Sequence, residues 1–83
     1  MLFRSLTLAK NPNTPPQLLE RYSASPDAAL RTSVARNPKV PSWLIEQMLD
    51  DPNEEVRLSL VYNPNTSAEL LQRLAQEIGR AHV

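Results

Sequence analysis

The 83-residue sequence contains no cysteine, a single glycine and a single histidine. Without cysteine the chain can form no disulfide, no thiolate zinc site, no iron–sulfur cluster and no cysteine nucleophile. One glycine supplies no glycine-rich phosphate loop, and His82 has no plausible catalytic partner nearby in sequence. We therefore expect a protein that is not an enzyme, has no cofactor or metal and acts on no small-molecule substrate.

Long apolar runs are also lacking, because none approaches the roughly 20 residues needed to cross a bilayer. The opening stretch, MLFRSLTLAK, is basic and has no acidic residue, which is weakly similar to a transit peptide. Half of a structural repeat is the better interpretation, since the stretch resembles two later ones that also lead into Asn-Pro. We expect no membrane contact and a cytoplasmic location, where proteins need no disulfides.

The net charge is zero, but its distribution along the chain is uneven. Residues 1–40 contain six Lys/Arg and two Asp/Glu, whereas residues 41–83 contain three and seven, so the halves carry +4 and −4. A neutral total argues against strong non-specific binding to nucleic acid, which depends on neutralising many phosphates. Nucleic-acid binding by the basic half is kept as the alternative function, with these candidate residues: Arg4, Lys10, Arg21, Arg31, Arg36 and Lys39.

Most of the chain is a repeat with a fixed period of 26 residues. The copies are AKNPNTPPQLLERYSASPDAALRTSV (9–34), ARNPKVPSWLIEQMLDDPNEEVRLSL (35–60) and the truncated VYNPNTSAELLQRLAQEIGRAHV (61–83). Residues 1–8 then form an N-terminal half-repeat that seals one end of a single domain, 1–83. A fixed period of this length is typical of solenoids, in which stacked neighbours bury the apolar stripe that one repeat cannot bury alone.

Each copy is predicted to contain two helical segments and no β-strand. Apolar residues recur at helical spacing, prolines punctuate the helices, and no run alternates as a strand would. For the first segment we expect an N-cap at Thr14 or Thr66, with Gln17 or Glu69 completing a capping box. For the second segment we expect Ser25 or Asp51 as the cap, followed by proline.

The recurring residues resemble the leucine-rich repeat variant family. The resemblance covers residues 9 to about 78 and rests on Val56-Arg57, Val34-Ala35, Asn37-Pro38, Pro41 and Leu18-Leu19. It implies an all-α, right-handed helical-repeat solenoid in which α and 3₁₀ helices alternate, the second segment being the candidate 3₁₀ helix. The founding type of this family binds an iron–sulfur cluster through N-terminal cysteines, a function that this chain cannot share. A general HEAT-like repeat is the alternative fold.

Asparagine and arginine recur in register along the repeats. Asn11, Asn37 and Asn63 could form a polar row for a ligand, but a ladder that satisfies backbone groups at each turn is expected. Arg31 and Arg57 could form a basic stripe, but pairing with a carboxylate or with a carbonyl at a helix end is expected.

An acidic cluster lies where the second segment of the middle copy begins. It could bind a hard cation such as Ca²⁺, but helix capping and a favourable interaction with the helix dipole explain it more simply. Its members are Asp50, Asp51, Glu54 and Glu55.

In and after the middle copy, four positions depart from the polar character of their counterparts. The middle copy lacks both members of the capping box, the missing N-cap alone should cost roughly 1 kcal/mol, and such departures are more frequent at functional sites. We therefore predict a partner-binding patch centred on Trp43. Val40 replaces Thr14 and Thr66, Trp43 replaces Gln17 and Glu69, Leu58 replaces Thr32, and Tyr62 replaces Arg36.

Two interpretations of these residues remain open. Trp43 and the weaker members Leu58 and Tyr62 could be exposed anchors for another protein, since aromatic residues dominate such interfaces. Alternatively, Trp43 could fold over the short Asn-Pro loops, and Leu58 and Tyr62 could pack against the incomplete last repeat.

The two ends of the chain suggest self-association. Apolar residues crowd both ends, and the charges of the two halves are opposite, so we expect head-to-tail contact between copies. The predicted function is a non-catalytic protein–protein interaction or scaffold module, with a purely structural subunit of a larger assembly as a further alternative. The terminal apolar residues are Leu2, Phe3, Leu6 and Leu8 at one end and Ile78 and Val83 at the other.

Overall fold

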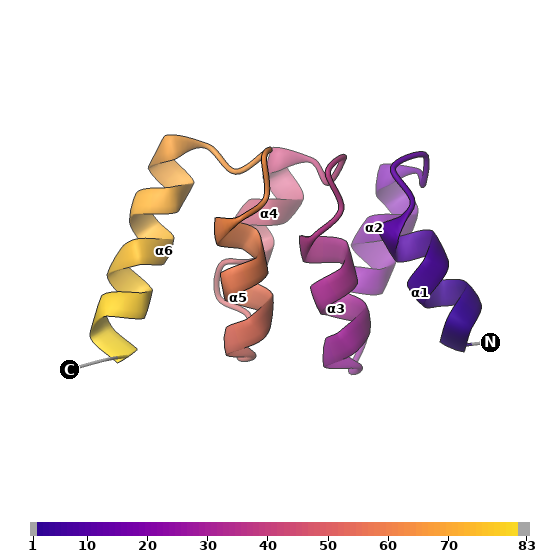
Figure 1. Cartoon of the computed structure of the whole chain (residues 1–83), viewed down its shortest axis with the longest axis horizontal. Coiled ribbons are helices and arrows are strands. Elements are labelled where there is room, and N and C mark those ends of the chain that lie inside the picture. The colour runs from indigo at the N-terminus through magenta and orange to yellow at the C-terminus, as the bar shows by residue number, and fades with distance from the viewer. Residues whose placement is uncertain (1, 82–83) are drawn as a thin grey trace.

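A computed structural model of the chain describes residues 2–81, with side chains described for residues 5–76. These residues form six α-helices and no strand, which confirms the all-helical prediction. The molecule is elongated, measuring 40 × 22 × 16 Å, and the two ends of the chain lie at opposite ends of its long axis (Figure 1). The helices are α1 (Leu2–Lys10), α2 (Pro16–Ser23), α3 (Ala28–Ala35), α4 (Ser42–Met48), α5 (Glu54–Val61) and α6 (Ala68–Ala81).

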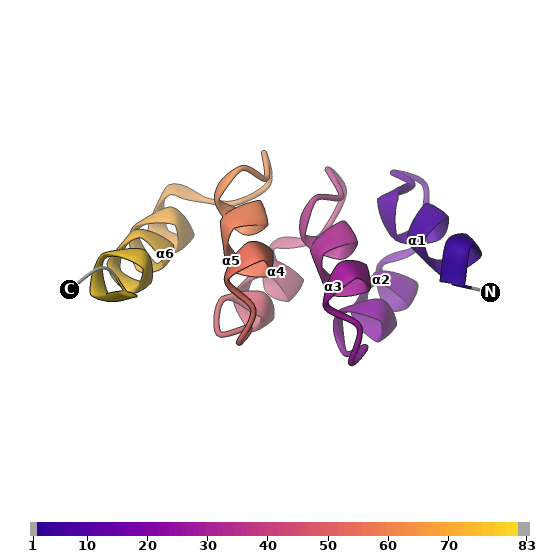
Figure 2. The same cartoon turned by 60° about the horizontal axis from the view of Figure 1, so that its bottom comes forward.

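The helices form two rows that follow the repeat. The second segments α1, α3 and α5 lie side by side, and α3 packs against both of its neighbours in this row (Figures 1 and 2). The first segments α2 and α4 lie behind them, where α2 packs on α3 and α4 on α5. Helix α6 lies at the C-terminal end, in contact with α5.

The first segments begin differently from the prediction. Pro15 and Pro41 occupy the N-cap positions of α2 and α4 in extended conformation, without a side-chain cap. Because proline takes the cap position itself, Thr14 lies one residue outside the helix, and its hydroxyl donates to a carbonyl of the preceding helix. Thr66 does the same, donating to Leu60 O at 2.6 Å. The capping boxes predicted at Gln17 and Glu69 are therefore wrong, and α6 is capped by Ser67, whose Oγ accepts from Leu70 N–H.

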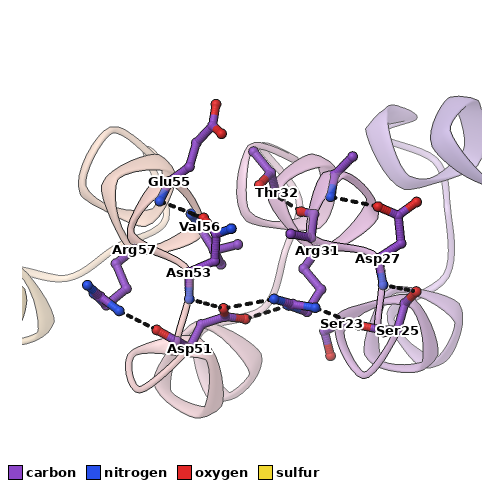
Figure 3. Close-up of polar contacts among 12 residues, drawn as sticks. Ser23, Ser25, Asp27, Arg31, Thr32, Asp51, Asn53, Glu55, Val56 and Arg57 are labelled. Atoms are coloured by element: carbon purple, nitrogen blue, oxygen red, sulfur yellow. Dashed lines mark hydrogen bonds and ion pairs between the residues drawn. The ribbon is translucent and has the colours of Figure 1, made fainter.

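The second segments begin later than predicted and are fully α-helical. Asp27 and Asn53 are the N-caps, and each accepts from the backbone N–H two residues further along, at 3.0 and 2.8 Å. Ser25 and Asp51 instead close the turn before the helix by accepting from Asp27 and Asn53 N–H (Figure 3). The prediction of caps at Ser25 and Asp51 is wrong, and α3 and α5 are α-helices where the family resemblance implied 3₁₀ helices.

One apolar core lies between the two rows. It contains apolar residues that recur at helical spacing in both kinds of segment, including the pairs Leu30 and Val34 of α3 and Val56 and Leu60 of α5. Small residues at the ends of α1 and α3, Ala9 and Ala35, are also fully buried. Among the predicted positions, His82 and Val83 lie outside the described residues, and the side chains of Leu2, Phe3, Arg4 and Ile78 lie outside the described side chains. The other buried apolar residues are Leu19, Val40, Leu44, Ile45, Met48, Leu49, Leu70 and Leu74.

Candidate interaction surface

The recurring asparagines form the predicted ladder between adjacent Asn-Pro turns. Asn37 is 1% exposed, and its Nδ2 donates to Ala9 O at 2.7 Å and to Asn11 O at 2.9 Å. Its Oδ1 accepts from Lys39 N–H at 2.8 Å, which holds its own turn closed. One side chain therefore satisfies three backbone groups on two successive repeats, as the structural interpretation required.

The same bonds recur 26 residues later. Asn63 Nδ2 donates to Ala35 O at 2.7 Å and to Asn37 O at 2.9 Å, and its Oδ1 accepts from Asn65 N–H. Asn65 adds a second rung, because its Nδ2 donates to Pro38 O at 2.5 Å and to Val40 O at 3.1 Å. The middle and last turns are therefore joined by two asparagines rather than one.

The arginines pair as predicted. Arg31 binds both carboxylate oxygens of Asp51, at 2.8 Å from Nε to Oδ2 and 3.3 Å from Nη2 to Oδ1, and donates to Ser25 O (Figure 3). The two side chains are 14% and 7% exposed, so the pair is largely shielded from water. Arg57 donates to Asp51 O at 2.5 Å. These bonds link the start of α3 to the start of the next second segment, and they remove Arg31 from any basic surface.

The acidic cluster is divided by these contacts. Asp51 binds Arg31, whereas Asp50, Glu54 and Glu55 are exposed to solvent. Across the part of the chain that the structure describes, no group of three acidic or histidine side chains is arranged to hold a metal ion.

Val40 does not belong to a partner-binding surface. It is 0% exposed, in the slot where Thr14 and Thr66 place a hydroxyl on a buried carbonyl beneath the turn. The prediction is wrong because this slot faces the core. Nor does Val40 remove a helix cap, since Pro41 caps α4 as Pro15 caps α2. The substitution exchanges an internal hydrogen bond for an apolar contact.

The other three predicted residues are exposed, but they lie in two places. Trp43 on α4 is 46% exposed, whereas Leu58 on α5 is 37% exposed and Tyr62, the C-cap residue of α5, is 83% exposed. Leu58 and Tyr62 lie one turn apart and line a pocket of about 320 Å³ together with Arg36 and Glu55. Trp43 is not part of this lining. The single patch predicted from sequence is therefore an α5 site and a separate aromatic side chain in the other row.

A second pocket, of about 330 Å³, lies between α1 and α3. Leu6 and Lys10 of α1 line it, and Arg36 and Glu55 are shared with the first pocket. Arg36, at the C-terminal end of α3, bridges to α5, because its Nε donates to Ser59 Oγ at 3.3 Å and its guanidinium lies 3.9 Å from Glu55. The two pockets share Arg36 and Glu55 and lie along α1, α3 and α5, and we call them together the second-segment groove.

The residues that line the groove recur at the 26-residue period, and Leu6 of the N-terminal half-repeat belongs to the same series. Positions 6, 32 and 58 hold Leu, Thr and Leu, and positions 10, 36 and 62 hold Lys, Arg and Tyr, at intervals of 26 residues. The aligned copies already place Lys10 in register with Arg36 and Tyr62, and extending the period back into residues 1–8 places Leu6 in register with Leu58. The aromatic side chain thus ends a row whose first two members are basic.

The basic residues proposed for nucleic acid do not gather on one surface. Lys10 and Arg36 line the second-segment groove, Arg21 lies on α2 in the other row, and Arg31 is paired with Asp51. Lys39 is exposed on a turn, and the side chain of Arg4 lies outside the described region.

Comparison with known proteins gives no relative from which a function could be inferred. No protein family, curated protein or solved structure matches the chain. Among the described helices, none combines the length and the apolar character that crossing a membrane requires.

Proposed function

We propose that this chain is a non-catalytic protein-interaction module, built as a right-handed helical-repeat solenoid. The two helical rows, the 26-residue register of the asparagine ladder and the elongated shape support this architecture. Two α-helices in each complete repeat favour a HEAT-like form over the alternating α and 3₁₀ helices of the leucine-rich repeat variant resemblance.

The exposure of Tyr62 beside a pocket is the observation that carries the proposal. An 83% exposed aromatic side chain stands next to Leu58 on one wall of the second-segment groove, where the preceding repeats place basic residues. Covering an aromatic side chain of this size with a partner is worth about 1.5–3 kcal/mol before the costs of association. Arg36 and Glu55 at the rim can then orient a polar partner group.

The sister repeats supply matched variants for testing this surface. Tyr62→Arg and Leu58→Thr introduce the residues that positions 36 and 32 already hold, and Trp43→Gln introduces the residue at position 17. The tagged chain is used to isolate binding proteins, and each candidate is then titrated in purified form against all variants. We expect Tyr62→Arg to weaken binding at least about tenfold, as for a hot-spot residue, and Trp43→Gln to leave it unchanged. Loss on Trp43→Gln with full binding by Tyr62→Arg would place the site on α4 instead.

Nucleic-acid binding through the basic half is the weaker alternative. Two of its six candidate cations, Arg31 and Arg36, have carboxylate neighbours within 4 Å. It requires affinity that falls steeply with salt and does not respond to Tyr62→Arg, whereas the proposed function requires the reverse.

A further inference from the structure

We propose that the α5 face, at which Leu58 and Tyr62 are exposed, is covered by a second copy of this chain stacked head to tail. The copies would be joined by the same asparagine rungs that join the repeats inside one copy. This inference rests on the proposed function, because it names the partner of the same surface.

The N-terminal end presents unused hydrogen-bond donors. Asn11 and Asn13 are exposed, and they stand 52 residues before Asn63 and Asn65, two periods of 26. Asn11 Oδ1 accepts from Asn13 N–H at 2.8 Å, as each asparagine of the ladder does in its own turn. Among residues 2–81, however, neither Nδ2 has an acceptor, whereas the two later asparagines donate four bonds.

The C-terminal turn presents the matching acceptors. The carbonyls that accept the interior rungs belong to residues 35, 37, 38 and 40, and their counterparts one repeat later are residues 61, 63, 64 and 66. Asn63 O accepts from Thr66 N–H at 3.1 Å. Asn37 O has the same bond from Val40 at 3.2 Å and still accepts a rung at 2.9 Å, so this bond leaves a second lone pair available.

The order of the helices allows a second copy to continue the repeat. The row of second segments runs α1, α3, α5 with α2 and α4 behind it, and α6, the first segment of the last repeat, lies beyond α5 at the C-terminal end (Figure 1). Among the described residues 2–81, the last second segment is α5 and the last first segment is α6. A following copy placed with its α1 beside α5 and its α2 beyond α6 continues both rows in the order they already have.

The exposed fractions of equivalent side chains on α3 and α5 indicate which surface of α5 a following helix would cover. Thr32 on α3 is 9% exposed, with α5 packed alongside, whereas Leu58 at the same register position of α5 is 37% exposed. Leu6 and Lys10 line the α1–α3 pocket together with Ala29 and Ser33 of the following helix. By the 26-residue register, Leu58 and Tyr62 turn toward a following helix in the same way.

Charge favours the same orientation. The half that carries the donor turn has a net charge of +4, and the half that carries the acceptor turn has −4. Approach of unlike ends is favoured and that of like ends is opposed, and salt screens both effects. Because each copy keeps one unused end, the contact does not close on itself and produces chains of copies.

Two variants each disable one end and leave the other intact. Asn11→Asp keeps the Oδ1 that closes its own turn, but it replaces the donor with a carboxylate that would face carbonyl oxygens. Leu58→Lys places a cation on an exposed position that would meet the basic end of the next copy. Circular dichroism melting is used to check that both variants remain folded. Asn65→Lys, which introduces the residue of position 39, does not test the contact between copies, because it breaks a hydrogen bond inside one copy.

Sedimentation velocity of the 83-residue chain at low salt tests the proposal. We expect the weight-average mass of the wild type to rise with concentration past the dimer, and the association constant of either variant to fall at least about tenfold. The two variants mixed in equal amounts should form a dimer that grows no further, because one working end of each kind is available. A wild type that stays monomeric, or a mixture that stays monomeric while the wild type associates, overturns the proposal. In the first case, Tyr62-dependent binding of another protein would leave the proposed function standing.

Discussion

Removing the central rung of the asparagine ladder should destabilise the chain severely. Asn37→Ala deletes bonds to Ala9 O, Asn11 O and Lys39 N–H, at 2.7, 2.9 and 2.8 Å, at a site with 1% exposure. A buried backbone group left without a partner costs about 1–3 kcal/mol. Asn11 O keeps its bond from Thr14 N–H, so the loss comprises one orphaned buried carbonyl, Ala9 O, and the turn bond to Lys39 N–H, and we expect a loss of roughly 2–4 kcal/mol. A domain of this size has only about 5–10 kcal/mol of stability.

The matched control for this variant is Asn11→Ala. Asn11 makes the equivalent turn bond to Asn13 N–H, but it is exposed and carries no rung, so its loss should cost at most about 1 kcal/mol. Urea denaturation followed by far-ultraviolet circular dichroism gives both free energies, and each kcal/mol lowers Tm by about 4–8 °C in a domain of this size. Equal losses for Asn37→Ala and Asn11→Ala would refute the reasoning, because the ladder would then contribute nothing beyond its turns.

Three further outcomes follow from the same geometry. Asp51→Ala should lower the free energy of unfolding by about 2–4 kcal/mol, since it leaves the Arg31 guanidinium largely buried without its carboxylate, and a double-mutant cycle with Arg31→Met should recover part of that loss. Asn53→Ala should lower the free energy of unfolding by about 1 kcal/mol, because it removes the N-cap of α5, and urea denaturation measures this loss. Ser67→Ala removes the equivalent cap of α6 and is measured in the same way. Trp43, the only tryptophan, should show red-shifted fluorescence that acrylamide quenches readily in the monomer, and a blue-shifted, protected spectrum would contradict its 46% exposure.

The all-helical fold was predictable because the same residue pattern recurs in each copy of the repeat. Helical spacing of apolar residues identified the buried faces, and the recurrence of Asn before Pro identified a ladder, since a side chain needed for one turn is needed for all. Recurrence also indicated that Arg31 and Arg57 are structural, as their bonds to Asp51 and its carbonyl confirm.

Helix starts were not predictable to the residue, because two cap-forming residues compete at each start. In Ser25-Pro26-Asp27 and Asp51-Pro52-Asn53, either polar side chain can cap, and the structure uses the first for a turn and the second for the helix. Likewise Thr14 precedes two prolines, and only the backbone geometry decides that Pro15 takes the cap.

The exposed residues were predicted only in part, because the polarity of the residue that is replaced does not show whether its side chain faces the core or the solvent. Val40 and Trp43 both replace polar residues, but Val40 stands in a slot where threonine itself is buried, and Trp43 in one where Gln17 and Glu69 are exposed. Leu58 and Tyr62 share a helix face, so their pocket could be anticipated. Their separation from Trp43 depends on how α4 packs behind α5, which the sequence of neither helix specifies.

Hydrogen exchange of the asparagine side-chain amides, followed by NMR over a range of protein concentrations, tests the stacked-repeat account most directly. In dilute solution we expect slow exchange at Asn37 and Asn63, whose amides are buried and bonded, and fast exchange at Asn11 and Asn13. As concentration rises at low salt, Asn11 and Asn13 should become protected while the interior rungs stay unchanged. Exchange at Asn37 as fast as at Asn11 would contradict the ladder, and exchange at Asn11 that is independent of concentration would contradict the head-to-tail stack.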